Sequence, residues 1–439
     1  MDENVKKLIV VCYPLDWHWV LSTEYISSHI DVEQFEILDL SQLGENGVKN
    51  FFKKFFNGNI FQRKIQKNLA CHGIKIMKYR SYFHFQYKLG YLFVNFEKWT
   101  EEDFGPTYNS IVEFTGSLRI HHKKHKEIIW KELVKDILVK KILSELNLEK
   151  YDEIVTVNGR FTKNATVVQW CKENQMLYKL LEFGSSKEKF EIYLSSPHSM
   201  QEIELKISQH WENFKSHSKK SIAETYLNKL CQDSDFAKIG WRNRMKTGEA
   251  PTISNKLICT FYASTEVEYA GVGDIKPEGF FKNQVEAFES LLKCLDSSTW
   301  HIYLRRHPKN PSAKIADPEQ FLWSKFSNSN LTIISPESSI DSLALGKQSD
   351  LIANYSSLIA MEFIARGFEN VITMGPAPWN KLLPTRYTPS IEALKRYLNQ
   401  SSPKINSEDI YPWAYYYATF GTEFKVFKYS TPESRWVFR

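Results

Sequence analysis

The sequence has 439 residues, of which 42% are hydrophobic and 25% are charged, and its net charge is +6. This length suits two domains, and the composition excludes disordered and collagen-like classes. No apolar run approaches the roughly 18 residues of a membrane span, and the six cysteines are widely separated, which is typical of reduced thiols in a cytoplasm.

The first half of the chain begins and ends with short apolar strands that alternate with helices. We expect strands at 8–12, 35–40, 154–157 and 178–181 and helices at 21–29 and 164–174. Between these elements lies a long insert, residues 46–150, that carries many basic and aromatic side chains. The pattern predicts a Rossmann-like N-terminal domain over residues 1–246 with this insert in it.

The part of the insert from residue 46 to 96 contains no Asp or Glu but ten Lys and Arg, mixed with phenylalanines and tyrosines. Basic residues among aromatic ones suit an anionic membrane surface. Alternatively, the aromatics are core and the lysines a solvated face. No recognition motif supports nucleic acid as a partner. We expect a cytoplasmic protein, with peripheral contact to the inner face of the cytoplasmic membrane as the finer hypothesis.

From residue 257 to 374, strand and helix alternate five times. The strands are expected at 257–263, 301–305, 331–335, 351–354 and 371–374, and shorter helices at 318–326, 338–346 and 357–365. The alternation predicts a doubly wound, Rossmann-like C-terminal domain over 247–404, after a hinge at 247–251. An aromatic segment, 405–439, is expected to be helical near 411–417 and to pack back on the body. Two Rossmann-like domains facing each other predict a ligand cleft.

Polar side chains follow the strands of the C-terminal domain, at the edge where open parallel sheets bind ligands. Arg305, Arg306, His307 and Pro308 follow one strand; Ser356 and Ser357 follow another, with Glu362 on the next helix. Cationic donors, hydroxyls and the backbone N–H groups that open a helix can hold a phosphate without metal. We therefore expect a nucleotide or diphosphate to bind here.

These motifs resemble those of GT-B glycosyltransferases of bacterial surface polysaccharide assembly, in particular the sialyltransferases and the Kdo transferases of capsule and lipopolysaccharide synthesis, which use CMP-activated acidic sugars. His307-Pro308 is similar to their HP motif and Ser356-Ser357 to their Ser-Ser/Thr motif, both of which contact the nucleotide. The segment from Ser338 to Ser342 also resembles surface-carbohydrate biosynthesis proteins. The resemblance implies that Arg305, Arg306, Ser338, Ser342 and Glu362 belong to the donor site. It covers most of the chain beyond residue 152.

The same families carry an acidic-acidic-Gly motif that supplies the catalytic carboxylate. Here the corresponding stretch is Glu182-Phe183-Gly184, with Phe183 in place of the second acid. Glu182 is our candidate general base because transfer to a sugar hydroxyl needs a carboxylate within hydrogen-bond reach, and His307 is the second catalytic candidate. Residues expected to line the cleft or bind the acceptor are Asp16, Asn158, Arg160, His198, Glu266 and Glu268.

The resulting hypothesis is a metal-independent glycosyltransferase that takes a nucleotide sugar, with a CMP-linked acidic sugar favoured, to a glycan or lipid-linked acceptor. His307, Ser356, Ser357 and the helix dipole would stabilise the leaving phosphate, so no metal or cofactor is expected. The histidines at 121, 122 and 125 have lysine neighbours and are interpreted as solvated surface. Alternatives are a sugar-nucleotide 2-epimerase, a CDP-polyol phosphotransferase and a non-catalytic subunit of glycan assembly.

Overall fold

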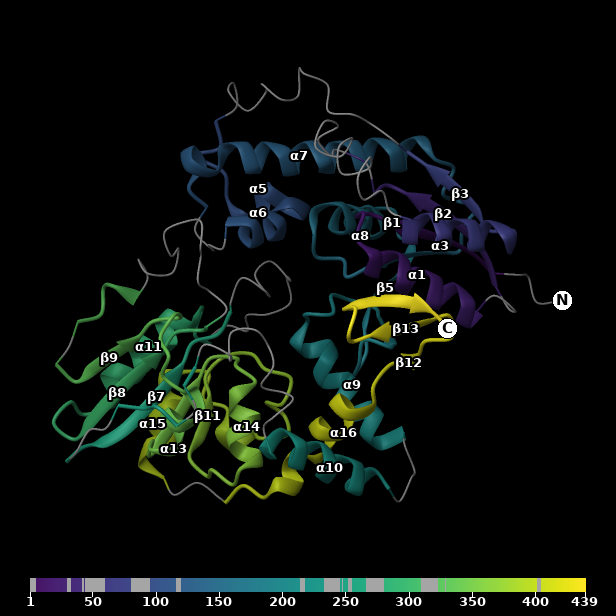
Figure 1. The fold of residues 1–439 in the computed structure, drawn as a ribbon. Helices are drawn as coiled ribbons and strands as arrows, with labels where there is room; N and C mark the ends of the chain where they lie inside the picture. Colours follow the sequence, from purple (N-terminus) through teal and green to yellow (C-terminus); the bar gives the residue numbers. More distant parts are fainter. Residues whose placement is uncertain are drawn as a thin grey trace. The chain divides into compact units, whose positions relative to one another are not determined.

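The computed structural model describes residues 5–29, 33–41, 43, 60–79, 95–115, 120–213, 218–232, 245–246, 248–251, 255–265, 280–308, 323–327, 329–400 and 404–439 (Figure 1). The chain divides into two compact units. The first unit comprises residues 1–115, 119–197 and 419–439, and the second comprises 116–118 and 198–418. The division therefore falls at 197/198 instead of the expected 246/247, and the chain returns to the first unit at its end.

The first unit is built on a seven-stranded sheet with the order β12-β6-β5-β4-β1-β2-β3. Its parallel strands are β1 (Val5–Val11), β2 (Glu33–Asp39), β3 (Lys75–Lys78), β4 (Glu153–Val157) and β5 (Leu177–Phe183), followed by antiparallel β6 (Lys189–Tyr193) and β12 (Thr422–Glu423). The parallel strands have the Rossmann order 3-2-1-4-5, so the strand order reverses between β1 and β4.

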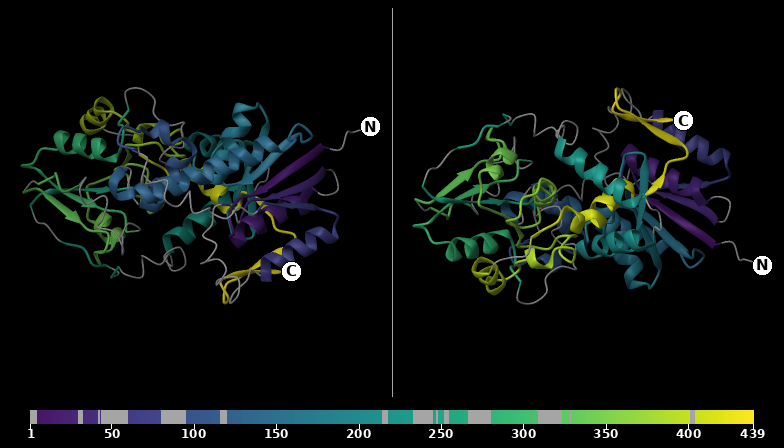
Figure 2. Two further views of the ribbon diagram at one scale, coloured as in Figure 1. Left: turned by 90° about the horizontal axis from the view of Figure 1, so that it is seen from above. Right: turned by 90° about the horizontal axis from the view of Figure 1, so that it is seen from below.

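Alternating side chains of this sheet build a separate core on each face. Ile9 and Val11 face α1 (Asp16–His29) and α3 (Ile60–Cys71), whereas Leu8 and Val10 face α7 (His122–Glu145) and α8 (Thr162–Glu173). Short helices α5 (Glu101–Phe104), η2 (Gly105–Thr107) and α6 (Tyr108–Thr115) precede α7. Figure 2 shows helices on both sides of this sheet. The first unit is therefore a three-layer α/β structure.

The segment expected to be an insert contributes to this architecture. Within residues 46–150, β3 forms the outer strand of the parallel sheet beside β2, and α7 supplies Val139, Ile142 and Leu143 to a core. β3 and α7 are therefore parts of the Rossmann-like unit and not of a segment inserted into it. β3 was missed because its four residues begin and end with lysine, which hides the apolar pattern of a strand.

The second unit contains a parallel five-stranded sheet in the order β11-β10-β7-β8-β9. The strands are β7 (Leu257–Tyr262), β8 (Trp300–Arg305), β9 (Leu331–Ile334), β10 (Leu351–Asn354) and β11 (Val371–Thr373). This is again the order 3-2-1-4-5, with its reversal between β7 and β10. The expected α/β fold with two Rossmann-like units is thus confirmed.

Helices cover both faces of the second sheet. Phe261 and Leu304 pack with α11 (Gln284–Cys294) and with Leu394 of α15 (Ile391–Asn399). On the other face, Ile258 and Tyr303 pack with α13 (Ser342–Lys347), and Tyr262 contacts Phe363 of α14 (Ile359–Ala365). Helices α9 (Met200–Asn213) and α10 (Lys219–Gln232) join this unit, where Arg366 donates to the carbonyl of Leu230 at 2.9 Å. These contacts place the division before α9.

The aromatic C-terminal segment packs back on the body, as expected. Helix α16 (Tyr411–Thr419) contributes Tyr411, whose hydroxyl donates to Glu224 of α10 at 2.9 Å. The chain then forms β12 and the antiparallel hairpin β13 (Phe427–Ser430) and β14 (Arg435–Phe438). Both views in Figure 2 show this hairpin beside α3, where Phe427 contacts Phe61 with ring centroids 5.7 Å apart.

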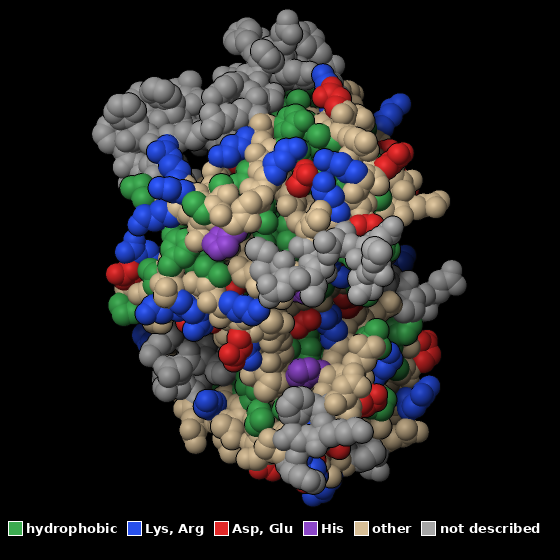
Figure 3. Space-filling view, turned by 90° about the vertical axis from the view of Figure 1, so that its right-hand side faces the viewer, with side chains coloured by type: hydrophobic (Ala, Val, Ile, Leu, Met, Phe, Trp, Pro, Cys, Tyr) green, Lys and Arg blue, Asp and Glu red, His purple; other side chains and the backbone are tan. Residues whose placement is uncertain are grey.

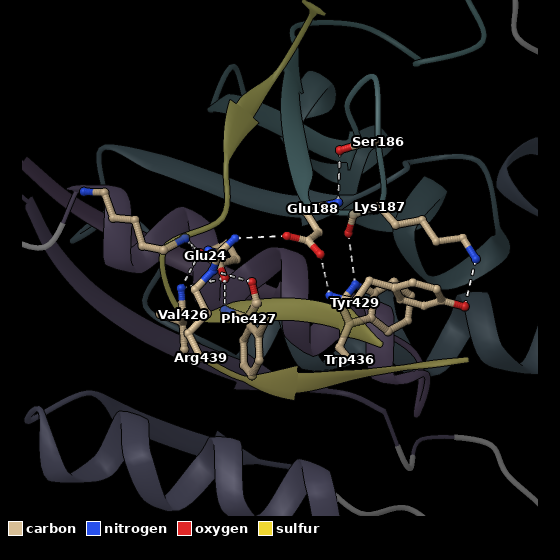
Figure 4. A network of polar contacts seen from close by, with 10 residues as sticks. Glu24, Ser186, Lys187, Glu188, Val426, Phe427, Tyr429, Trp436 and Arg439 are labelled. Carbon is tan, nitrogen blue, oxygen red and sulfur yellow. Dashed lines mark hydrogen bonds and ion pairs between the residues drawn. The ribbon is translucent and has the colours of Figure 1, made fainter. Parts of the chain in front are cut away.

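Polar contacts hold the hairpin on the first unit (Figure 4). The fully buried carboxylate of Glu24 in α1 accepts hydrogen bonds from the backbone N–H groups of Lys425, Val426 and Phe427. Glu188, in the turn between β5 and β6, accepts from the N–H of Tyr429 at 2.9 Å and from the Arg439 guanidinium at 3.0 Å. We call this set of contacts the hairpin latch.

Two further observations concern the surface. In the part of the chain that the structure describes, no helix combines the length and the apolar character needed to cross a bilayer. The face of the first unit that bears α3 and β3 carries many Lys and Arg side chains in its upper part (Figure 3).

Candidate functional site

The candidate base Glu182 lies at the carboxyl end of β5, beside the reversal point of the first sheet. In the sheet register, Val10 of β1 lies opposite Thr156 of β4, and Val157 of β4 lies opposite Leu181 of β5. The strands β1, β4 and β5 therefore end at the same level. The loops after these strands therefore meet at one edge. This is the edge at which Rossmann-like sheets bind ligands.

The loop after β4 is shaped to reach Glu182. Asn158 and Gly159 both have left-handed backbone conformations, with φ of 65° and 76°. A Cβ atom on Gly159 would lie 2.7 Å from a methyl carbon of Leu180, so the loop lies directly against β5. The Asn158 side-chain amide consequently donates to the Glu182 carboxylate at 2.6 Å and accepts from the Arg160 N–H at 3.2 Å.

Burial controls the acidity of Glu182. Desolvation raises the pKa of its carboxyl above the usual value, and the hydrogen bonds from Asn158 and the Phe183 N–H and the charge of Arg160 oppose this effect without cancelling it. Arg160 is itself buried and pairs with Glu113 at 2.5 Å. A carboxyl with a raised pKa accepts a proton near neutral pH more readily than an exposed one, which suits a general base.

A buried histidine at the same edge escaped the sequence analysis. His18 opens α1 after β1, is 0% exposed, and neither ring nitrogen has a hydrogen-bond partner among the described residues. Desolvation, with a smaller contribution from the charge of Lys163, lowers its pKa to about 3, so the ring is neutral. Tyr13 lies 5.5 Å from it, centroid to centroid. Applying the strand-end rule to β1, as was done for the second half, would have singled out these residues.

In the second unit, β8, β7 and β10 also end at one level, because Tyr262 pairs with both Arg305 and Asn354. The loops that begin at Arg306, Ala263 and Tyr355 therefore leave the same edge of the sheet. His307 and Pro308 are half-buried there, and so are Ser356 and Ser357. The structure thus brings the His307-Pro308 and Ser356-Ser357 motifs to one sheet edge, about two strand spacings, or roughly 10 Å, apart.

The loop after β10 is held by its own hydrogen bonds, which corrects one expectation. The N–H of Ser356 donates to the Ser264 hydroxyl at 2.9 Å, and the N–H of Ser357 donates to the Asn354 side chain at 3.0 Å. The Ser356 hydroxyl donates to the carbonyl of Pro376 at 2.6 Å. These two N–H groups, expected to be available to a phosphate, are instead used to fix the loop.

Arg305 also differs from its expected role. It is 1% exposed, and its guanidinium donates to the Ser335 carbonyl at 2.5 Å and to the Ser342 hydroxyl at 3.2 Å, with a longer contact to the Ser338 carbonyl. Arg305 therefore anchors the loop between β9 and α13. The Ser338 carbonyl and the Ser342 hydroxyl belong to that anchor. Arg306 is also buried, and its backbone N–H donates to the backbone carbonyl of Ile334 at 3.1 Å.

The remaining predicted residues are dispersed. Asp16 is exposed and accepts from Gln62 at 3.0 Å, and His198 is half-buried at the start of the second unit. Glu362 is half-buried on α14. Glu266 and Glu268 lie outside the described residues.

Of the three histidines at 121, 122 and 125, one is buried. His125 is 4% exposed, and its pKa is lowered by burial and by its cationic neighbours, which corrects the solvated interpretation for this residue. Within the described ranges, no group of three or more His, Cys, Asp or Glu side chains is placed to hold a metal ion.

Comparison with known proteins gives weak similarities. No family model and no curated protein matches the chain. Among solved structures, the UDP-GlcNAc 2-epimerase of Methanocaldococcus jannaschii is 12% identical, with 92% of this chain and 96% of that chain covered and a TM-score of 0.31. A glycosyltransferase of Streptomyces nogalater is 10% identical, with 95% of both chains covered and a TM-score of 0.22. Both TM-scores are below 0.5. The two Rossmann-like units are therefore defined by the strand order of the two sheets.

Proposed function

We propose that the chain is a GT-B-type glycosyltransferase that moves a sugar from a nucleotide-activated donor to a glycan or lipid-linked acceptor. The observation that carries this proposal is the desolvated, amide-bound Glu182 at the carboxyl end of β5, one strand from the reversal point of a Rossmann-like sheet. The second unit supports it with His307 and Ser356 at a matching edge of a second such sheet.

In this proposal, the two units have different tasks. The second unit binds the nucleotide through His307, Pro308, Ser356 and Ser357, and the first presents the acceptor to Glu182. The acceptor hydroxyl gives its proton to Glu182 as its oxygen bonds to the anomeric carbon of the donor sugar. The bond from that carbon to the phosphate oxygen breaks, and its electron pair leaves with the nucleotide. Because His307 and the Ser357 hydroxyl would stabilise that charge, transfer needs no divalent ion.

The identity of the donor and of the acceptor is proposed from the sequence motifs. The similarity of His307-Pro308 and Ser356-Ser357 to enzymes that use CMP-activated sugars favours a CMP-linked acidic sugar such as Kdo as donor. The same similarity favours a capsular or lipopolysaccharide acceptor at the inner face of the cytoplasmic membrane.

The experiment is a turnover assay with CMP-sialic acid, CMP-Kdo, UDP-GlcNAc, GDP-mannose and CDP-ribitol, with and without EDTA. Glu182→Gln should lower kcat at least about 100-fold and leave the Kd for nucleotide unchanged, because general-base catalysis contributes this much or more. Glu173→Gln is the control, since Glu173 is an exposed carboxylate at the end of α8 in the same unit. His307→Ala should weaken nucleotide binding.

Product analysis separates the alternatives. Exchange of the sugar C2 proton of UDP-GlcNAc without an acceptor would indicate a 2-epimerase, and a new phosphodiester would indicate a polyol phosphotransferase. Nucleotide binding without turnover of any donor would indicate a non-catalytic subunit. Equal activity of Glu182→Gln and wild type would remove Glu182 from the mechanism.

A further inference from the structure

Helix α3 has two faces of opposite character. Ile65 and Leu69, with Gln62, are buried against the first unit. Ile60, Arg63, Lys64 and Lys67 are exposed, and their spacing of three, four and seven residues places them along one stripe of the helix. Ile60 is 69% exposed. The stripe thus combines cations with an exposed apolar residue.

A second feature of this stripe is the state of its cations. Within the described residues, Arg63, Lys64 and Lys67 make no hydrogen bond or ion pair. Many other exposed lysines have an acidic partner, as Lys123 does with Glu97. The sequence explains the difference, because no Asp or Glu occurs between residues 46 and 96.

Beside the stripe, α3 and β3 enclose an open hollow of about 400 Å³. Among the described residues, Arg63, Gln66, Lys67, Lys78, Ala70, Ile74 and Ile76 line it, without a carboxylate. Lys78 donates to Gln66 at 2.6 Å, which draws its ammonium toward α3. A hollow with an apolar wall and several cations fits a phosphate group attached to a hydrocarbon-bearing molecule.

The described carboxylates that contact α3 and its neighbouring strands have other partners, and Asp16 accepts from Gln62, on the buried side of α3, at 3.0 Å. Glu36 is engaged by Lys6 at 3.0 Å, and Asp39, which is 6% exposed, accepts from the Ser41 N–H and from Gln66. Lysines on the edge strand β3 also protect its open backbone from pairing with other chains. That role does not explain Arg63, Lys64 and Lys67, which lie on a helix.

We propose that the α3 stripe and the adjoining hollow bind the anionic phospholipid surface of a membrane. The cations attract phosphate headgroups, and Ile60 enters the interface between headgroups and acyl chains. A soluble polyanion would use the cations but would gain nothing from an exposed isoleucine. The inference concerns a surface distinct from the reaction site, so its test does not depend on the proposed transferase activity.

The experiment measures partition of the full-length protein onto large unilamellar vesicles by flotation. Vesicles with about 30% phosphatidylglycerol in phosphatidylcholine are compared with pure phosphatidylcholine. Binding should need the anionic lipid and should fall at 0.5 M salt, where the Debye length is only a few ångströms. Arg63→Gln/Lys67→Gln should lower the partition coefficient about 25-fold, at roughly fivefold per cation.

The matched control is Lys395→Gln/Arg396→Gln, which removes one Lys and one Arg from the exposed face of α15. It should change partition less than about twofold. Ile60→Ser should weaken binding while its salt dependence persists. An equal effect of both double variants would show that only net charge matters and would overturn the proposal. Binding to soluble polyphosphate without binding to vesicles, or no response to Ile60→Ser, would also overturn it.

Discussion

At the scale of single residues, the reversal point of the first sheet carries two titratable groups whose acidity is shifted by the same cause. Burial raises the pKa of Glu182 and lowers that of His18. In both cases the protein disfavours the charged form. The difference lies in the partners: Asn158 holds the Glu182 carboxylate, whereas the His18 ring has no hydrogen bond among the described residues.

His18 should make stability depend on pH. In the unfolded chain the ring binds a proton near pH 6.5, but in the folded protein it does so only near about 3. The unfolded state therefore binds more protons across this window, and stability is lost as pH falls, by up to about 1.4 kcal/mol per pH unit. His18→Leu should lack this component and keep or gain stability at pH 7, because two unpaired ring nitrogens are removed.

Urea unfolding of wild type and His18→Leu at pH 7, 5.5 and 4.5 checks this expectation. The difference between the two proteins is the useful quantity, since Glu182 contributes in the opposite direction. His72→Asn is the control, because His72 is exposed. Parallel pH dependences of wild type and His18→Leu would contradict the argument.

At the scale of elements, the hairpin latch depends on one buried carboxylate. Glu24 accepts three backbone N–H groups, although burial still raises its pKa. Glu24→Gln replaces one acceptor oxygen by a donor and leaves at least one N–H without a partner. We expect a loss of about 1–3 kcal/mol in the free energy of unfolding and faster hydrogen exchange at residues 425–427. Glu423→Gln, at an exposed carboxylate of β12, should change neither quantity.

The elements also show what the sequence could predict. The five strands of the second unit lie within one residue of their expected bounds, because each is a short, largely apolar run between polar turns. Helix α16 and the ending of α14 before Gly367, whose φ is 83°, were predicted as well. β6, β12 and the hairpin were missed because short antiparallel strands with Lys, Glu and Arg at their ends resemble surface loops.

The site was less predictable than the fold. Strand-end reasoning led to Glu182, Asn158, His307 and Ser356 because parallel strands finish at one edge. It could not show that Arg305 is used by loop carbonyls, since that depends on how the chain between β9 and α13 folds over it. His18 follows β1 and was missed because strand-end reasoning was applied only to the other strands; its complete burial could not be predicted from the sequence.

At the scale of the whole molecule, the first unit needs residues 419–439 to complete its core. Phe424 is 4% and Phe427 0% exposed, and each contributes about 2–3 kcal/mol of burial. Deletion of residues 420–439 should therefore lower hydrogen-exchange protection throughout the first unit. The second unit should keep its protection and serves as the internal control. Equal loss in both units would mean that they unfold together, and no loss would contradict a structural role for the segment.

The return of the chain to its starting unit also affects biosynthesis. Residues 198–418 are contiguous, so the second unit can be complete while the ribosome still holds the last β-strands. Until those strands emerge, β6 lacks its neighbour β12, and the ring of Phe190 lacks the cover of Phe424. Domains of most proteins mature in the order of synthesis. Here the unit that is translated first receives its last strand only after the second unit has been synthesised.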